Sequence, residues 1–474
     1  KIPLFSLETK TKAKEFEMIG FSFQYELSFT NFINMLELAG INPFREQRSS
    51  KDPIIMGGGP TCFNPGILKE FVDLLVIGDG EEVLPRILEI YEEKRNKKDF
   101  LNRASKLKGV FVPGINTSVS PAVFKKFDLR YYPTDFPVAV VNIPNNRINL
   151  EINRGCFRKC RFCQARTIYS PYRQKSRKQI LDLARESVSS TGYGEISLTS
   201  LSATDHTEIL EIMDDLHYAF RELGVSVVLS SMRPDSFLTG LSDRLMRLRK
   251  GGLTFAPETP SEKLKKVLNK NVSNEDIIRA ANCAKRKGWK KIKLYFMIGI
   301  PGETKEDIEE IPEFIKKVKK ESGLNISATI SPLKPQPHTP FQWLKNENPD
   351  SLAEKFNFIK KKSPALIKNF NPEQEIIERI LSRGDKTLAK IVYTAYRNGA
   401  RYDQWKENFN FSNWDKAFKQ NKSRWQDYYY KEFEKLSTLP WDCVDAPVKK
   451  DMLRISYEKS TKPGEKKRRE CLQE

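Results

Sequence analysis

The sequence shows no apolar run long enough to cross a membrane, and we expect no signal peptide. Histidine is scarce, with 3 His in 474 residues, and the 7 Cys are odd in number and irregularly spaced outside one loop. An odd, irregular set argues against a disulfide framework. These absences exclude an integral membrane protein and a disulfide-stapled secreted domain, and they predict a cytoplasmic protein in a reducing compartment. Because the first residue is Lys rather than Met, we also expect the chain to begin inside a domain.

Acidic residues are also few relative to basic residues. Against 81 Lys and Arg there are 61 Asp and Glu, which gives a net charge of +20. Such an excess favours a polyanionic partner, RNA above all. The alternative is a set of solvated helix faces, of which the lysines at 360–362 are an example. Composition alone leaves both interpretations open.

The most informative stretch is a loop with three cysteines. Cys156, Cys160 and Cys163 are spaced C-x-x-x-C-x-x-C and follow an alternating run at 147–154 and a glycine. Three thiolates can hold three irons of a [4Fe–4S] cluster and leave the fourth iron without a protein ligand. Structural zinc takes four ligands, and the nearest other cysteines are the distant Cys62 and Cys283. The spacing therefore predicts an iron–sulfur cluster; three unrelated buried thiols are the alternative.

Basic residues crowd this loop. Positive charge lowers the pKa of a thiol and favours the thiolate that binds iron. We therefore expect the three cysteines to be acidified by their neighbours, which are Arg154, Arg158, Lys159, Arg161 and Arg166.

The first part of the chain, residues 1–130, alternates apolar strands with helices. Strands are expected at 18–23, 53–60 and 71–78, and helices at 30–39 and 79–93. This alternation predicts a parallel, doubly wound α/β sheet. The glycines at 57–59 indicate either a tight turn or a close backbone approach to a ligand. Further on, Asn145 and Asn146 predict a hairpin turn between two alternating runs.

Residues 131–368 read as six strand–helix units. The first strand precedes the cysteine loop, and the others lie near 195–199, 225–229, 252–256, 291–298 and 326–330. Right-handed crossovers between such units give a partial (β/α)6 barrel. Residues 369–474 are predicted to be helical, with a disordered tail at 460–474. The aromatic residues there indicate a small helical core or, alternatively, platforms for stacked bases.

The cysteine loop resembles the motif of the radical SAM superfamily, including the aromatic Phe162 before the last cysteine. The resemblance implies that the open iron chelates the amino and carboxylate groups of S-adenosylmethionine (SAM). An electron from the reduced cluster then cleaves the sulfonium and releases a 5′-deoxyadenosyl radical. It also implies a reducing partner such as flavodoxin or ferredoxin.

The same resemblance assigns SAM contacts to residues at strand ends, where barrel enzymes place their sites. Thr199 and Ser200 stand in place of the family's Gly-Gly-Glu motif, although the literal motif is absent. Gly299 lies in a segment, 298–303, that resembles the adenine-side motif after the fifth strand. We expect Glu303 in that segment to support the loop.

Three more side chains have a SAM role and a structural alternative. Ser230 and Arg233 match groups that meet the ribose or carboxylate, or they cap a turn. Glu258 matches the group that hydrogen-bonds the ribose, or it pairs with a helix N-terminus. His338, after the sixth strand, contacts substrate or is a satisfied loop histidine.

The N-terminal part is similar to the cobalamin-binding-type domain that precedes the barrel in one branch of the superfamily, and the whole arrangement looks like a bacterial subfamily of that branch. The matching pieces are residues 57–60 and 76–82. The Asp-x-His-x-x-Gly motif that ligates cobalt is absent, because the first histidine is His206. Cobalamin therefore stays open.

Three functions follow as hypotheses. The first is a radical SAM enzyme that modifies RNA or a translation-related protein, with methyl or methylthio transfer as candidate reactions. The second is a radical SAM enzyme acting on a small metabolite or peptide. The third is a non-catalytic iron–sulfur protein that binds nucleic acid. If RNA binds, we expect it to meet a basic surface at the barrel mouth, formed by Arg158, Lys159, Arg161, Arg166, Arg173 and Lys175.

Overall fold

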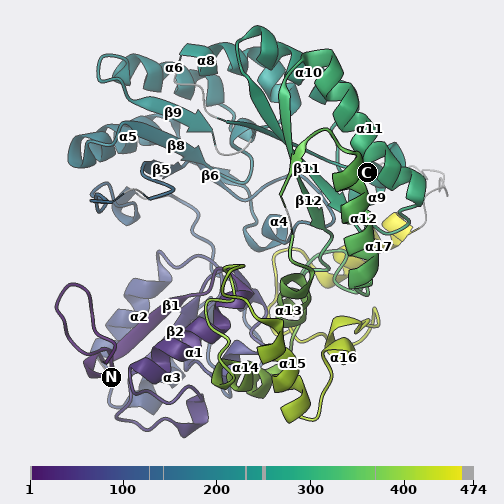
Figure 1. Ribbon diagram of the computed structural model, residues 1–474. Coiled ribbons are helices and arrows are strands. Elements are labelled where there is room, and N and C mark those ends of the chain that lie inside the picture. Colours follow the sequence, from purple (N-terminus) through teal and green to yellow (C-terminus); the bar gives the residue numbers. More distant parts are fainter. Residues whose placement is uncertain are drawn as a thin grey trace, which may run out of the picture.

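The computed structural model describes residues 3–127, 129–141, 143–229, 232–247, 252–368 and 370–461. In Figure 1 the barrel strands β8 to β12 lie in the upper half, and the N-terminal strands lie below them beside α13, α14 and α15. Ser230, one of the predicted SAM contacts, is outside the described residues.

The N-terminal sheet has four strands in the order β1-β2-β3-β4. They are β1 (Met18–Ser22), β2 (Ile54–Gly58), β3 (Leu74–Val76) and β4 (Val110–Phe111), with α1 (Phe29–Leu38), α2 (Val83–Glu92) and α3 (Lys97–Ala104) between them. The first three strands pair in parallel, as continuous apolar strands should, but β4 is antiparallel to β3. The predicted parallel pairing of the first three strands is confirmed, but the doubly wound order was wrong, because the strand order of the described residues runs in one direction without a reversal.

The second architectural part contains the six predicted parallel strands, divided between two sheets. One sheet holds β5 (Ile148–Glu151), β8 (Glu195–Thr199) and β9 (Ser226–Leu229). The other holds β10 (Leu253–Glu258), β11 (Lys291–Ile298), β12 (Asn325–Pro332) and a short β13 (Leu366–Ile367). The connecting helices include α5 (Arg177–Thr191), α6 (Ile209–Phe220), α10 (Asn274–Arg286), α11 (Lys305–Ser322) and α12 (Pro349–Lys362). This is a mixed α/β fold with a barrel-like core.

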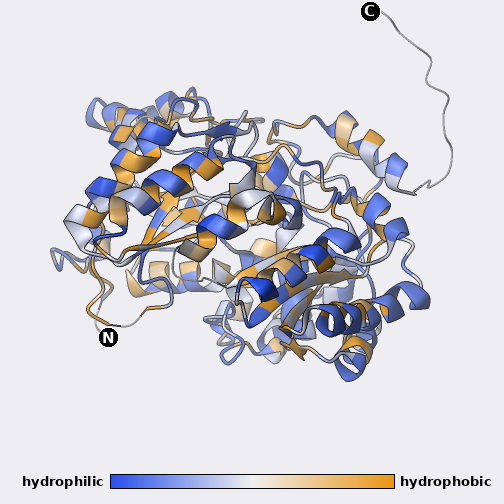
Figure 2. Cartoon of the chain, turned by 90° about the horizontal axis from the view of Figure 1, so that it is seen from above, coloured by the Kyte–Doolittle hydropathy of each residue, from blue (hydrophilic) through white to orange (hydrophobic). Residues whose placement is uncertain are grey.

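The helices are held to these strands by alternate apolar side chains. Along β11, for instance, Ile292, Leu294, Phe296 and Ile298 are buried in one core with the helices, while Lys293 and Tyr295 on the other face are partly exposed. Figure 2 shows the same division on many helices, which carry hydrophobic and hydrophilic residues in alternating bands. The face of β11 that points away from the helices therefore carries polar side chains, so the barrel interior is not lined by apolar side chains alone.

No hairpin forms at Asn145 and Asn146, so that prediction was wrong. Among the described residues before this turn there is no strand to complete a hairpin, and β5 instead pairs in parallel with β8. The alternating run after the turn forms β5 of the barrel instead, where Ile148 and Leu150 are buried.

Four of the five C-terminal helices share a core with the N-terminal sheet, whereas the last one packs against the helix Glu262–Leu268. The five are α13 (Pro372–Ser382), α14 (Leu388–Arg397), α15 (Phe411–Gln420), α16 (Trp425–Tyr429) and α17 (Lys450–Thr461). One core joins Phe23 and Phe71 of the first part with Ile377 and Trp414 of the last part. The core interpretation of the C-terminal aromatics therefore holds for Trp414, although its core is shared with the N-terminal part. Of the predicted disordered tail, residues 460 and 461 end α17, and 462–474 lie outside the described residues.

None of the helices in the described part of the chain is both long and apolar enough to span a bilayer.

Candidate iron–sulfur and S-adenosylmethionine site

The cluster loop, residues 155–163, is fixed at both ends. It follows β6 (Asn153–Arg154), which pairs with β7 (Arg173–Gln174), and it leads into α4 (Gln164–Ile168). Gly155 has φ +82°, and a Cβ there would lie 2.6 Å from the carbonyl oxygen of Tyr169 and 2.7 Å from that of Pro171. Only glycine fits this close approach. The start of the loop is therefore fixed at Gly155, because a side chain at this position would collide with the backbone of residues 169 and 171.

All three cysteines of this loop are free thiols with intermediate exposure. The charge of Cys160 acts on the pKa of both Cys156 and Cys163, so the three sulfurs share one environment. Among the described residues, these three cysteines included, no group of three or more His, Cys, Asp or Glu side chains is placed so that it could hold a single metal ion. Three thiols in one loop, with no fourth protein ligand beside them, fit a cluster with one open iron better than a tetrahedral zinc ion.

The expected acidification of these thiols was wrong. Burial is the largest influence, and it raises the pKa of Cys156, Cys160 and Cys163. Binding of iron to these thiols must therefore release protons.

Two of the nearby arginines, Arg154 and Arg158, offset this effect at most in part, because carboxylates already pair with their charges. Arg154 contacts three carboxylates: Asp79 at 2.8 Å, Glu81 at 2.7 Å and Glu151 at 2.8 Å. Arg158 holds Asp205 through two hydrogen bonds of 3.0 and 2.5 Å.

Arg161 is buried and serves as a helix cap. Its guanidinium donates to the carbonyl oxygens of Lys266 and Val267 at 2.7 and 2.8 Å, at the end of α9 (Glu262–Leu268), and to Ser456 of α17 at 3.1 Å. These bonds tie the cluster loop to α9 and α17.

Arg173 and Lys175 do not belong to an exposed basic surface, so that part of the RNA prediction was wrong. Arg173 is paired with Asp79 and donates to the Phe124 carbonyl at 2.8 Å. The side chain of Lys175 is fully buried beneath the rings of Phe127 and Tyr132. Burial also lowers the pKa of Lys175 to about 7. Charge reversal at either position would disrupt the fold instead of testing RNA binding.

Two of the predicted SAM contacts lie near the cluster loop. The carboxylate of Glu258 and the guanidinium of Arg233 both act on the pKa of Cys160, as does the ammonium of Lys270. Glu258 adopts φ +65° at the end of β10 and is paired with Lys270 at 3.0 Å. Its partner is thus a lysine side chain and not a helix N-terminus. Strand ends and cysteines meet here as the barrel topology requires.

Arg233 precedes the short helix α7 (Pro234–Ser236), but its side chain does not cap it. Instead it donates to Asp235 at 2.9 Å and to the Asn271 carbonyl at 2.9 Å. These partners orient the guanidinium beside the loop, where it could exchange Asp235 for a ligand carboxylate.

The remaining strand-end residues take part in local hydrogen bonds. The Thr199 carbonyl, at the end of β8, accepts from Ile152 N–H at 3.1 Å, and Ser200 Oγ accepts from Ser202 N–H at 3.0 Å. Gly299 follows β11 and donates its N–H to Glu303 at 3.0 Å. Glu303 supports this loop as predicted. Whether Thr199, Ser200 and Gly299 contact SAM stays a prediction.

For His338 and for the glycines at 57–59, the structural alternative holds. His338 is buried, and its Nε2–H donates to the Phe63 carbonyl at 2.8 Å, so it is a satisfied loop histidine. A Cβ at Gly57 would lie 2.7 Å from the Phe23 ring, so the glycine turn serves close packing.

The sequence analysis missed Asp79 and Glu81 as neighbours of the cluster loop. They lie in the segment 76–82, which was noted for its resemblance to another domain and not for its carboxylates. Their pairing with Arg154 and Arg173 joins the N-terminal sheet to the strand before the cysteines. A signal was present in the sequence, since two carboxylates after a buried strand need partners.

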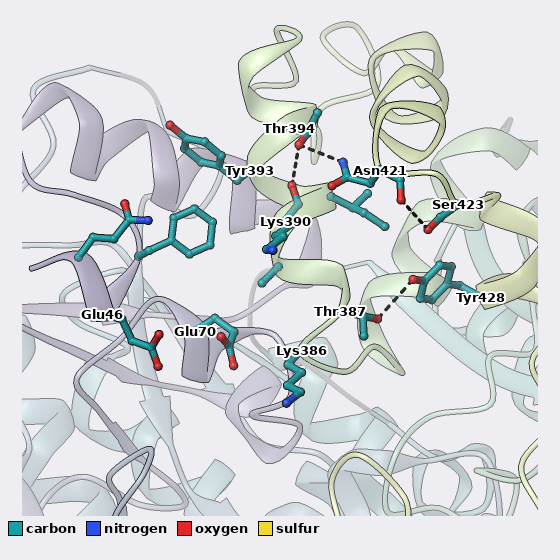
Figure 3. A pocket seen from close by; sticks show the side chains of 14 residues that line it. Glu46, Glu70, Lys386, Thr387, Lys390, Tyr393, Thr394, Asn421, Ser423 and Tyr428 are labelled. Carbon is teal, nitrogen blue, oxygen red and sulfur yellow. Dashed lines mark hydrogen bonds between the residues drawn. The ribbon is translucent and has the colours of Figure 1, made fainter.

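A pocket of about 960 Å³ lies away from these residues. Figure 3 shows Lys386, Lys390 and Tyr393 on one side of it and Glu46 and Glu70 on the other. It belongs to the junction of α14 with the N-terminal sheet, and none of the predicted site residues lines it.

Comparison with known proteins agrees with this geometry. A family described as radical SAM proteins, N-terminal, matches residues 1–113, and the radical SAM superfamily matches residues 150–315, which include the three cysteines. An uncharacterised protein of Methanocaldococcus jannaschii is 33% identical over 400 residues, covering 82% of this chain and 83% of that protein.

Two further similarities are weaker. The ribosomal protein uS12 methylthiotransferase RimO of Bacteroides thetaiotaomicron is 28% identical over 265 residues, 51% of this chain and 60% of that protein. The radical SAM methyltransferase TsrM of Kitasatospora setae, solved with cobalamin and a [4Fe–4S] cluster, aligns with a TM-score of 0.49 and 14% identity over 69% of this chain and 65% of that chain.

The cluster loop, the barrel and these family matches define an iron–sulfur enzyme. The chain belongs to the radical SAM superfamily. Its cofactors are those of that superfamily, a [4Fe–4S] cluster and SAM.

Proposed function

We propose that this radical SAM enzyme transfers a methyl or methylthio group to RNA or to a protein of the translation apparatus. The observation that carries the site is the convergence of Cys160, Arg233 and Glu258 from three separate segments. A cluster bound on the three cysteines supplies the electron that cleaves SAM.

In this proposal the chain's own residues bind and orient SAM. Glu258, held by Lys270, accepts hydrogen bonds from the ribose hydroxyls. Arg233 exchanges Asp235 for the SAM carboxylate, because a guanidinium pairs with either carboxylate in the same geometry. Backbone groups at Thr199, Ser200 and Gly299 line the remaining strand ends.

The substrate class rests on two observations. The net charge of +20 favours a polyanion or a partner bound to one. The relative named as a uS12 methylthiotransferase acts on a ribosomal protein, and it resembles about half of this chain. A small metabolite or a peptide is the second candidate, favoured by the partly exposed polar residues of the barrel interior, such as Lys293 and Tyr295.

Methyl transfer is the simpler of the two reactions. A methylthio group contains a sulfur atom as well as the methyl carbon, so its transfer needs a sulfur donor. In the described part of the chain the other cysteines, Cys62, Cys283 and Cys443, lie in separate segments and form no second group of ligands. Cobalamin also stays open, and no His precedes His206 to ligate it.

The first test of this proposal is anaerobic reconstitution with iron and sulfide. Wild type should bind one cluster and, once reduced, convert SAM to 5′-deoxyadenosine. The triple variant Cys156→Ala, Cys160→Ala, Cys163→Ala should lose both the brown chromophore and the bound iron, while Cys283→Ala, a buried cysteine elsewhere, should retain them. Full iron retention in the triple variant would contradict the ligand assignment.

The substrate is tested by mass spectrometry of cellular RNA and ribosomal proteins with and without the gene. A methyl adduct and a methylthio adduct differ in mass by one sulfur atom, so the two reactions are distinguished directly. A change confined to small metabolites would favour the second candidate.

A further inference from the structure

A hollow of about 340 Å³ lies beside the cluster loop, on the side of α17. It is lined by Lys159, Arg161 and Arg166 in and after the cluster loop and by Met452 and Ile455 of α17. None of Thr199, Arg233, Glu258 and Gly299 is among its described lining residues. The hollow is therefore separate from the predicted SAM contacts.

The hollow is directly next to a cluster ligand. Lys159 and Arg161 are the chain neighbours of Cys160, and the Asn269 side chain donates to the Lys159 carbonyl at 2.7 Å. The Arg161 N–H donates to the Leu268 carbonyl at 2.9 Å, so the loop backbone is held in place. A molecule seated in this hollow would be one residue away from the predicted iron ligand.

The charge of the hollow has one sign. Its described lining contains four basic side chains and no acidic one. Arg161 is occupied by the carbonyls at the end of α9. Within the described residues, Lys159, Arg166 and Lys459 have no carboxylate partner, in contrast to Arg154 and Arg158. Three unpaired cations beside one another favour an acidic ligand.

The hollow also exposes apolar side chains on a rigid support. Met452 is 64% exposed and Ile455 is 48% exposed. The helix α17 is anchored, because Leu453, which also lines the hollow, is buried in a core with Trp343 and Trp441. Methionine is enriched at protein interfaces, and Met452 is exposed here.

We propose that this hollow is the docking surface for an acidic protein that donates one electron at a time. The proposal rests on the proposed cluster ligands. In the transfer the donor loses one electron and the bound cluster gains it, and no atom moves. Carboxylates of the donor pair with Lys159, Arg166 and Lys459, while its apolar surface covers Met452 and Ile455.

Single-stranded RNA fits the hollow less well. Proteins that bind single strands supply aromatic side chains on which bases stack. No aromatic residue is among the described lining of this hollow, and two of its exposed residues are aliphatic.

The test is the rate of cluster reduction, followed by visible absorbance in a stopped-flow instrument. Reduced flavodoxin and reduced ferredoxin, both acidic, serve as protein donors, and dithionite serves as a small reductant. The variant Lys159→Glu, Lys459→Glu should be reduced at least about tenfold more slowly by the protein donors at low ionic strength, and salt should narrow the difference. Dithionite should reduce variant and wild type at the same rate.

Two controls make the outcome decisive. The variant Lys361→Glu, Lys362→Glu has the same charge change on exposed positions of α12 and should behave as wild type. Ile455→Ser, which keeps every charge, should also slow reduction by the protein donors. Unchanged rates in the Lys159 and Lys459 variant would overturn the docking surface, as would a loss of RNA binding without any loss of electron transfer. A wild type without a chromophore would instead overturn the proposed cluster, and with it this inference.

Discussion

The pairing of Asp79 with Arg154 and Arg173 makes a quantitative prediction about stability. Asp79 accepts hydrogen bonds from both guanidinium groups and from Phe124 N–H at 2.8 Å. The side chains of Asp79 and Arg173 are each 9% exposed, and that of Arg154 is 15% exposed. In Asp79→Asn the volume is kept but the charge is lost.

The expected cost follows from what each arginine retains. Arg154 keeps Glu81 and Glu151, so its charge stays compensated. Arg173 keeps only the backbone carbonyls of Phe124, Tyr169 and Pro171. Breaking a buried ion pair costs about 3–5 kcal/mol, and the retained carbonyls place this case at the lower end, about 3 kcal/mol.

The assay is urea unfolding of the cluster-free protein at pH 7, with the midpoint and the slope measured separately. Asp79→Asn should lower the midpoint without changing the slope. Glu89→Gln is the matched control, because Glu89 pairs with Arg86 on the surface, is 55% exposed and should contribute less than about 1 kcal/mol. The combination with Arg173→Met should cost less than the sum of the two single changes, since both remove one interaction.

The reasoning would be refuted if Asp79→Asn were within about 0.5 kcal/mol of wild type. If the prediction holds, the same variant should also lose iron to a chelator faster than wild type. Arg154 directly precedes Gly155 and the cysteines, so a looser Arg154 leaves the cluster loop less well held.

Three further predictions concern single side chains. Glu258→Ala should weaken SAM binding by about 1–3 kcal/mol in calorimetric titration, the usual loss for a hydrogen bond to a charged group, whereas Glu262→Ala, at an exposed side chain of α9, should not. Equal affinity of both variants and wild type would move the ribose contact elsewhere. Burial lowers the pKa of His338 from 6.5 to about 4. As the pH falls, the unfolded chain takes up this proton before the folded protein does, so the free energy of unfolding should fall by about 3 kcal/mol between pH 6.5 and pH 4. In unfolding curves at the two pH values, His338→Gln should reduce this fall. An unchanged pH dependence would show that other groups cause it. Burial lowers the pKa of Lys175 to about 7, so its contribution should make stability rise with pH above 7, and Lys175→Met should flatten that rise in the same assay; a rise as steep as in wild type would contradict the assignment.

The sequence by itself determined the cluster loop and most of the barrel. The cysteine spacing is local, and the alternation of apolar residues with helices fixes which faces are buried, so Lys291–Ile298 was predicted to the residue. The polar residues at strand ends could be located for the same reason. Parallel strands place their carboxyl ends together whatever their order in the chain.

Only the tertiary structure decided which charged side chains are paired and which are buried. The arginines near the cysteines were expected to acidify the thiols, but distant carboxylates had already paired with Arg154 and Arg158. Lys175 was expected at a surface and is buried between aromatic rings. The shared core of Phe71 and Trp414, which lie far apart in the chain, was likewise invisible in the sequence. Burial and ion pairing depend on which distant segments meet, and no local pattern records that.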